Sequence, residues 1–154
     1  MTKMLGFRRI LWPTDFSTGA TAALPHAMHL GSKPGAELVV LHVLPLAPVY
    51  PVPELSLGLW EQWDKETRAE AGRELGKLTA KLQKAKIRTK TVLVKGVPVD
   101  QILRAAKRLK CDLIVLATHG RTGLRHVLMG SVAENVVRRA SCPVLTVRPP
   151  RFKS

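Results

Sequence analysis

A glycine-punctuated loop in the second half of the chain has residue types and a spacing that suit phosphate binding. Gly120 and Gly130 have nine residues between them, and Ser131 follows the second glycine. An apolar run over residues 113–117 precedes the loop, and a helical pattern follows it. A loop that leaves a buried strand and enters a helix exposes backbone N–H groups beside a positive dipole end, and glycines let an anion approach closely. The sequence therefore predicts an anion cradle made of loop amides and the Ser131 hydroxyl.

A carboxylate follows the first apolar run of the chain, at Asp15. Two roles are open to it. As a turn residue, Asp15 caps the backbone of its own turn. As a ligand contact, it accepts hydrogen bonds from a bound molecule.

The loop residues also have a purely structural interpretation. A long loop needs glycines for its turns, and Ser131 with Glu134 three residues later matches a capping box, which predicts Ser131 as the N-cap of the following helix. Arg121, Arg125 and His126 either neutralise phosphates or form a solvated surface.

These motifs resemble those of the universal stress protein family. Its nucleotide-binding members carry Gly-x-x-Gly, nine residues, and then Gly-Ser or Gly-Thr. Gly120, Gly130 and Ser131 match the later positions, and the segment over residues 13–17 matches the family's turn after the first strand. The resemblance covers nearly the whole chain, from this turn to the ending at residues 142–148.

The resemblance implies a binding site for ATP, AMP or ADP, with Mg²⁺ held mainly by phosphates and water. It assigns Asp15 to the adenine or ribose edge and the backbone of Val43 to adenine. The nucleotide-binding residues predicted in this way are Pro13, Thr14, Asp15, Val43, Ala117, Thr118, His119, Gly120, Arg121, Gly123, Gly130, Ser131 and Val132.

Ala117 departs from the family pattern, because it occupies the place of the first motif glycine. Its methyl group either crowds the ribose and phosphates or is tolerated, since alanine needs only a negative φ at a strand end. The two outcomes define two functions. The first is a nucleotide-binding stress-response module, and the alternative is a protein–protein interaction module whose nucleotide site is closed.

The elements that must position these residues alternate between strands and helices. Apolar runs predict strands over residues 8–15, 38–44, 113–117 and 143–147, and alternation that includes Arg88 and Lys90 predicts an edge strand over residues 87–94. Helical periodicity lies between them, with Pro25 inside the first helical pattern. Alternation of this kind predicts an α/β fold, a single doubly wound open parallel sheet of five strands with helices on both faces. The resemblance implies the strand order 3-2-1-4-5, and we expect one domain over residues 1–154.

Two further segments have predicted roles. Four prolines between Pro45 and Pro53 predict an extended segment, interpreted as a mobile flap near the site. The last strand, from Pro143 to Val147, is expected at the sheet edge, and the resemblance implies a homodimer that pairs through it.

Composition limits the remaining possibilities. The net charge of +14 predicts attraction to polyanions, but the basic residues are spread along the sequence with few aromatics, so nucleic-acid binding is the third and least favoured function. Cys111 and Cys142 are expected to be reduced. With no apolar run of membrane-spanning length and no signal-peptide pattern, we expect a cytoplasmic protein and no membrane partner.

No residue pattern makes a strong case for catalysis. The P-loop lysine, the Gly-x-Gly-x-x-Gly fingerprint and a nucleophile elbow do not occur, and His26 and His29 have no third ligand for a metal. We therefore name no catalytic residue and no metal ligand, and we expect at most slow ATP hydrolysis.

Overall fold

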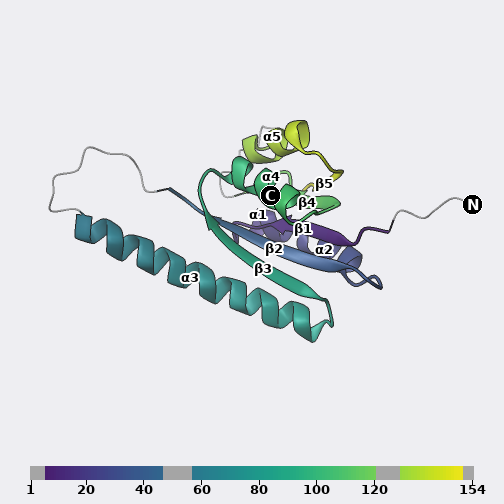
Figure 1. Cartoon of the computed structure of the whole chain (residues 1–154), viewed down its shortest axis with the longest axis horizontal. Helices are drawn as coiled ribbons and strands as arrows, with labels where there is room; N and C mark the ends of the chain where they lie inside the picture. The colour runs from purple at the N-terminus through teal and green to yellow at the C-terminus, as the bar shows by residue number, and fades with distance from the viewer. Residues whose placement is uncertain (1–5, 47–56, 121–128, 151–154) are drawn as a thin grey trace, which may run out of the picture.

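A single parallel sheet organises the chain. The structure is a computed structural model that describes residues 6–46, 57–120 and 129–150. Its five strands all run parallel in the order β3-β2-β1-β4-β5, which confirms the predicted order (Figure 1). The strands are β1 (Arg9–Pro13), β2 (Glu37–Leu44), β3 (Thr89–Lys95), β4 (Leu113–Ala117) and β5 (Val144–Val147).

Helices cover both faces of the sheet, as expected. They are α1 (Thr18–Thr21), α2 (Leu24–Gly31), α3 (Leu57–Lys84), α4 (Pro98–Arg108) and α5 (Ser131–Arg139). Apolar residues of α2 and α3 form one core cluster with the sheet, and those of α4 and α5 form the other. The long helix α3 runs alongside β3 (Figure 1).

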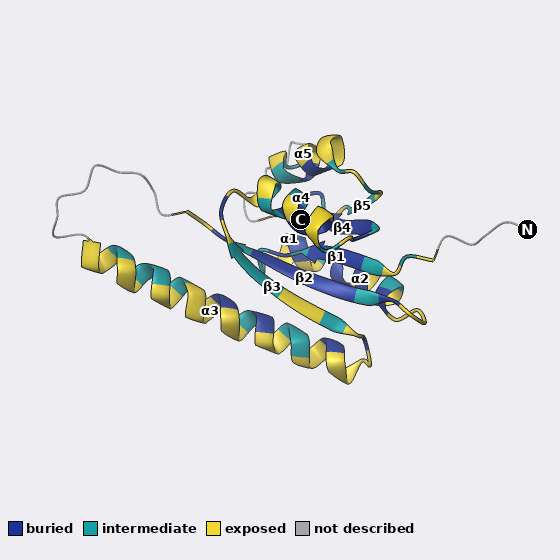
Figure 2. Ribbon diagram, viewed as in Figure 1, coloured by how far each residue is buried: buried dark blue, intermediate teal, exposed yellow. Residues whose placement is uncertain are grey.

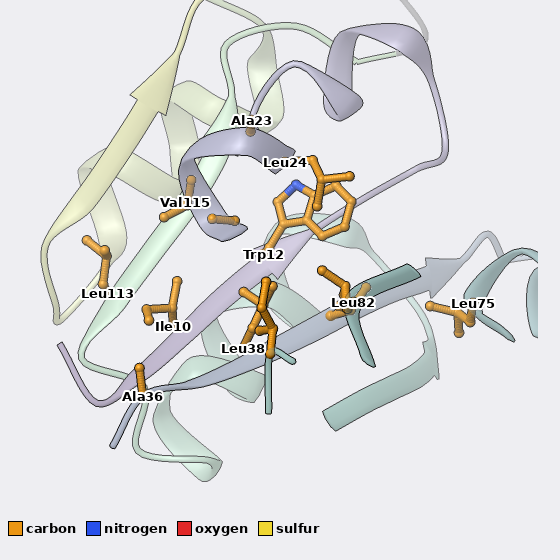
Figure 3. Packing of buried hydrophobic residues seen from close by; sticks show 13 residues of the cluster. Ile10, Trp12, Ala23, Leu24, Ala36, Leu38, Leu75, Leu82, Leu113 and Val115 are labelled. Carbon is orange, nitrogen blue, oxygen red and sulfur yellow. The ribbon is translucent and has the colours of Figure 1, made fainter. Parts of the chain in front are cut away.

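The central strands are buried on both faces, because their side chains alternate between the two clusters. In β1, Ile10 and Trp12 pack toward α2 and α3, whereas Leu11 packs toward α4. Figure 3 shows the Trp12 ring near Leu24 of α2 and Leu82 of α3. Figure 2 shows the same division, with dark central strands and exposed outer helix faces.

The first helical pattern is divided in two, as Pro25 suggested. Ser17 caps α1, since its Oγ accepts the N–H of Ala20 at 3.1 Å. Pro25 then lies in the first turn of α2, where its missing N–H has no intrahelical partner to lose. The chain therefore forms the short helix α1 directly after β1, and α2 begins as a separate helix at Leu24.

Helices α3 and α4 end in the same way, with a lysine in the left-handed conformation. Lys86 has φ 59° and Lys110 has φ 52°. The N–H of Lys86 bonds the carbonyl of Gln83, and the N–H of Ile87 bonds that of Leu82. The equivalent bonds follow Lys110. This is the Schellman pattern, in which glycine is the usual residue at the left-handed position because it has no Cβ.

The cysteines are free, as predicted, with Cys111 buried and Cys142 half-buried. Burial raises the pKa of the Cys111 thiol to about 11, and burial also raises the pKa of Cys142. The predicted flap between Pro45 and Pro53 lies mostly outside the described residues. In the part of the chain that the structure describes, no helix combines the length and apolar character needed to cross a membrane.

Candidate functional site

The predicted site residues gather where the order of the strands reverses. Strands β1 and β4 are neighbours in the sheet, but the chain continues from β1 to β2 on one side of the pair and from β4 to β5 on the other. Because the two strands are parallel, their carboxyl ends lie at the same edge, and the connections that leave them diverge there. Ligands bind at this place in sheets of this type. The turn after β1 and the start of the loop after β4 meet at this carboxyl edge.

The turn after β1 is held by its own side chains. Oγ1 of Thr14 accepts the N–H of Phe16 at 3.0 Å, and Oδ1 of Asp15 accepts the N–H of Ser17 at 2.9 Å. The backbone N–H of Thr14 continues the β1–β2 ladder by bonding the carbonyl of Leu41. Asp15 thus performs the turn role that the sequence allowed, and this fixes the orientation of its carboxylate.

A stacked pair of rings links the turn after β1 to β2: Phe16 belongs to that turn and His42 to β2. Phe16 adopts a left-handed backbone with φ 63°, and its ring stacks on His42 with 4.3 Å between centroids. His42 is buried and its Nδ1 lies 2.8 Å from the carbonyl oxygen of Thr14. Sequence reasoning missed this pair, because nothing in the local pattern marks a phenylalanine for positive φ.

Gly120 brings the loop after β4 against Asp15. A β-carbon at this position would lie 2.6 Å from Oδ2 of the carboxylate. Any other residue would therefore displace the Asp15 side chain. The glycine predicted as part of a phosphate cradle thus also lets the Asp15 carboxylate, the predicted ligand contact, keep its position.

A second close approach involves Gly19 of α1, which sequence reasoning missed. A β-carbon there would lie 2.6 Å from the carbonyl oxygen of His119. Its only available signal was a glycine in a helical pattern, where alanine is favoured. Gly19 lets α1 pack directly against the backbone of the loop, so α1 and Asp15 hold the start of the loop together.

The base of the loop is closed by its own backbone. The N–H of Gly130 bonds the carbonyl of Thr118 at 2.6 Å, and the N–H of Thr118 bonds Val147 of β5 at 2.9 Å. A β-carbon on Gly130 would lie 3.0 Å from the Thr118 oxygen. The first turn of α5 is therefore placed beside the end of β4.

The predicted capping box is wrong. Gly130, and not Ser131, is the N-cap of α5, and among the described residues no side chain caps this helix. Ser131 is already helical and exposed, while Glu134 pairs with Arg138 at 2.9 Å instead of reaching back. Within the part of the chain that the structure describes, no side chain accepts from the first amides of α5, which suits this helix end to an anion.

Ala117 ends β4 in ordinary strand geometry, with φ outside the left-handed region. Its methyl group packs against the cluster formed with α2 and α3. Val132 of α5 and Val43 at the end of β2 pack against the opposite cluster. The alanine methyl is therefore directed to the sheet face opposite α5, whose amides are the candidate phosphate ligands.

Not every predicted residue is described. Pro13 ends β1 and is half-buried, and Thr118 is buried with Oγ1 2.9 Å from Nδ1 of His119. Arg121, Gly123, Arg125 and His126 lie outside the described residues. The described residues contain no group of three or more His, Cys, Asp or Glu side chains able to hold a metal ion.

The arrangement offers non-covalent recognition. It combines an oriented carboxylate, which accepts hydrogen bonds, with glycine-lined backbone and helix-end amides, which donate them. This pairing suits a ligand that has a hydrogen-bonding ring or sugar at one end and an anion at the other.

Comparisons with a family model and with curated proteins find the same family. The model of the universal stress protein family matches residues 6–148. Universal stress protein MJ0531 of Methanocaldococcus jannaschii is 34% identical over 145 residues, covering 94% of this chain and 84% of that protein. MJ0577 of the same organism is 30% identical, covering 92% and 95%.

Solved structures share the fold. The MJ0577 structure has a TM-score of 0.83 at 29% identity and covers 96% of this chain and 99% of its own. More distant neighbours contain nucleotides. A universal stress protein in complex with cAMP has a TM-score of 0.59 at 22% identity, covering 94% and 99%. An Arabidopsis thaliana family protein with AMP bound has a TM-score of 0.67 at 18% identity, covering 93% and 92%.

Proposed function

The chain belongs to the universal stress protein family, and from this membership we propose that it binds an adenine nucleotide at the carboxyl edge of its sheet. The ligand is ATP, AMP or ADP, and the protein acts as a binding or signalling module. The relatives with cAMP and AMP bound support the ligand class, since they share the fold.

One observation carries the proposal, the convergence of Asp15 and Gly120. The turn after β1 and the loop after β4 are far apart in sequence, yet they lie so close that a β-carbon on Gly120 would stand 2.6 Å from the Asp15 carboxylate. A nucleotide needs a hydrogen-bond acceptor for its base or ribose and amides for its phosphates. We propose that the carboxyl edge supplies both, the acceptor from Asp15 and the amides from the loop after β4 and the start of α5.

We assign the two ends of the ligand to different parts of the site. Asp15 accepts from the adenine or ribose, and the backbone of Val43 meets the base, with Pro13 and Thr14 shaping the turn. The phosphates face residues 117–120, Arg121, Gly123 and the first turn of α5, including Gly130, Ser131 and Val132. Mg²⁺, when present, is held by phosphate oxygens and water.

Ala117 is compatible with this assignment. Its negative φ and its packing against the α2–α3 cluster support a site that remains open. The competing module with a closed site requires the methyl group to project toward the phosphates, and the packing of Ala117 disfavours this.

Hydrolysis, if it occurs, is slow. The site that we assign supplies positioning and electrostatic stabilisation, and we assign no residue to orient an attacking water. The proposed role is therefore binding and release and does not include turnover.

We also propose that two copies pair through β5. This strand forms one edge of the sheet, and Leu145 on it is 37% exposed. An apolar edge strand with unpaired backbone groups favours pairing with an identical strand, which satisfies those groups.

The function is tested on the purified full chain. The protein is denatured, and the released small molecules are identified by mass spectrometry; nucleotide-free protein is then titrated with AMP, ADP and ATP, with and without Mg²⁺. We expect a released adenine nucleotide or saturable binding, with ATP intact after hours. The proposal would be refuted if no adenine nucleotide is released and no binding is seen at millimolar nucleotide.

A further inference from the structure

The net charge of +14 is not accounted for by the nucleotide site. In a parallel sheet the amino ends of all strands lie at one edge, and the connecting helices end at that same edge. The exposed cations in the last turns of α3 and α4 and in the loops before β1 to β4 therefore gather there, opposite the nucleotide site. We call this surface the basic edge. Its exposed members are Arg8, Lys33, Lys81, Lys84, Lys86, Arg88, Lys107, Arg108 and Lys110.

The carboxylates of the basic edge are already engaged. Glu37 pairs with Arg9 at 2.8 Å and with Arg88 at 3.5 Å. Asp112 accepts the backbone N–H groups of Arg8 at 2.8 Å and Arg9 at 3.0 Å. Within the described residues, the side chains of Arg8 and Lys110 form no ion pair. They line a hollow of about 350 Å³ together with Arg88, so its unbalanced charge is positive.

Helix dipoles explain only part of this charge. Lys81, Lys84, Lys107 and Arg108 lie in the last turns of α3 and α4, where cations offset the negative helix end. That account does not cover Arg8, Lys33 or Arg88, which lie in loops.

The left-handed lysines are a second, independent observation. Lys86 and Lys110 occupy equivalent positions after α3 and α4, with φ 59° and 52°. Glycine is favoured at that position, yet a lysine occupies it after both helices. Two equivalent departures from the favoured residue, both adding charge to the same surface, point to a use for that charge.

The chemistry of the basic edge selects the partner. The large apolar side chains exposed on the described residues are Leu46, Leu57, Leu59, Val97, Val137 and Leu145, and none belongs to this edge. It therefore has no apolar anchor for a protein hot spot or for membrane insertion. The ring of Phe7, next to Arg8 in the chain, packs against the core instead of being free to stack on a base. Its guanidinium and ammonium groups suit phosphates.

We propose that the basic edge binds the phosphate backbone of double-stranded nucleic acid without reading its sequence. Spread along the sequence, these cations gave little indication of such a surface, and the parallel topology gathers them. The proposal is independent of nucleotide binding, because the basic edge lies at the amino ends of the strands and the nucleotide site lies at their carboxyl ends.

The test compares two triple variants of the full chain, with equal loss of charge at different places. Arg8→Gln, Lys86→Gln and Lys110→Gln alter the basic edge. Lys65→Gln, Arg73→Gln and Arg104→Gln form the matched control on exposed positions of α3 and α4. Binding to a fluorescent DNA duplex of about 20 base pairs is measured by anisotropy across a salt series. Thermal melting confirms that both variants are folded.

We expect the basic-edge variant to bind the duplex at least about tenfold more weakly at roughly 0.1 M salt, with a salt slope shallower by about 2–3. The control should lose about twofold or less, and both variants should bind adenine nucleotide as the unaltered chain does. Equal losses in the two variants would overturn the proposal, since net charge alone would then explain binding. So would no duplex binding at low salt, or tighter binding to phosphatidylserine vesicles than to the duplex.

Discussion

Gly120 lies so close to Asp15 that a β-carbon on the glycine would stand 2.6 Å from Oδ2 of the carboxylate. The other carboxylate oxygen, Oδ1, accepts the N–H of Ser17 at 2.9 Å. The carboxylate is therefore positioned by its own turn on one side and by the loop after β4 on the other. This contact joins the two segments to which we assign the nucleotide.

Adding a methyl group at Gly120 should weaken nucleotide binding more than it weakens the fold. The atom that it meets is the end of a side chain, which can rotate away, so Gly120→Ala should cost less than about 1 kcal/mol of stability. The rotated carboxylate would no longer face its ligand, and we expect affinity to fall about tenfold. Thermal melting and nucleotide titration measure the two effects.

Gly19→Ala is the matched comparison. Its β-carbon would meet the backbone carbonyl of His119 at 2.6 Å, which cannot move without shifting the loop. We expect a net loss of about 1–2 kcal/mol, since overpacking outweighs the helix preference of alanine. If Gly120→Ala instead unfolds the protein more readily than Gly19→Ala, our account of the two contacts is wrong.

Replacing Ala117 with glycine should leave nucleotide affinity unchanged within about twofold. The alanine has ordinary strand geometry, and its methyl packs against the core, so removing it opens no space for phosphates. Stability should fall by about 1 kcal/mol, because glycine is unfavourable in a strand. Calorimetric titration of both proteins decides the matter. Binding that appears only in the glycine variant would support the competing module with a closed site.

Charge placed on β5 should separate the proposed dimer. Leu145→Lys puts an ammonium group on an exposed apolar position of this edge strand, where like charges would meet across a two-fold pairing. Light scattering should give twice the chain mass for the unaltered protein and the chain mass for the variant. Val97→Lys is the control, since Val97 is exposed but lies before α4. A monomeric unaltered protein would remove the dimer proposal.

Glycine in place of the left-handed lysines should stabilise the fold and weaken duplex binding at the same time. Lys86→Gly and Lys110→Gly each relieve a positive φ, for a gain of about 0.5–1 kcal/mol. Each also removes a charge from the basic edge. Lys84→Gly, in the last turn of α3, removes the same charge without a stability gain. Denaturant melts and anisotropy with the DNA duplex measure both quantities. If the double variant Lys86→Gly, Lys110→Gly bound the duplex with unchanged affinity, these lysines would have no role in binding.

The fold was predictable because its signals are local and repeated. Apolar runs such as residues 113–117 mark strands buried on both faces, and Pro25 marked the division between α1 and α2. The strand order needed the family resemblance, since periodicity does not say which strands are neighbours.

The details of the site depend on tertiary contacts that sequence does not carry. Ser131 matched a capping box, but α5 begins at Ser131 itself, with Gly130 as its N-cap and the N–H of Gly130 bonded to the carbonyl of Thr118. Phe16 combines a positive φ with a ring stack on His42, a residue of another strand. The close approach at Gly19 arises from packing of α1 against the loop. The basic edge was hidden because its cations come from four separate stretches of chain.

Calorimetric titration of nucleotide-free protein with ATP and Mg²⁺, beside Asp15→Asn, tests the central claim most directly. Asparagine keeps an oxygen for the N–H of Ser17, so the turn and the melting temperature should be preserved. We predict one nucleotide per chain with a Kd below about 0.1 mM, and at least about tenfold weaker binding in the variant, or ~1.4 kcal/mol. Equal affinity in the two proteins, or no binding at millimolar ATP, would contradict the account.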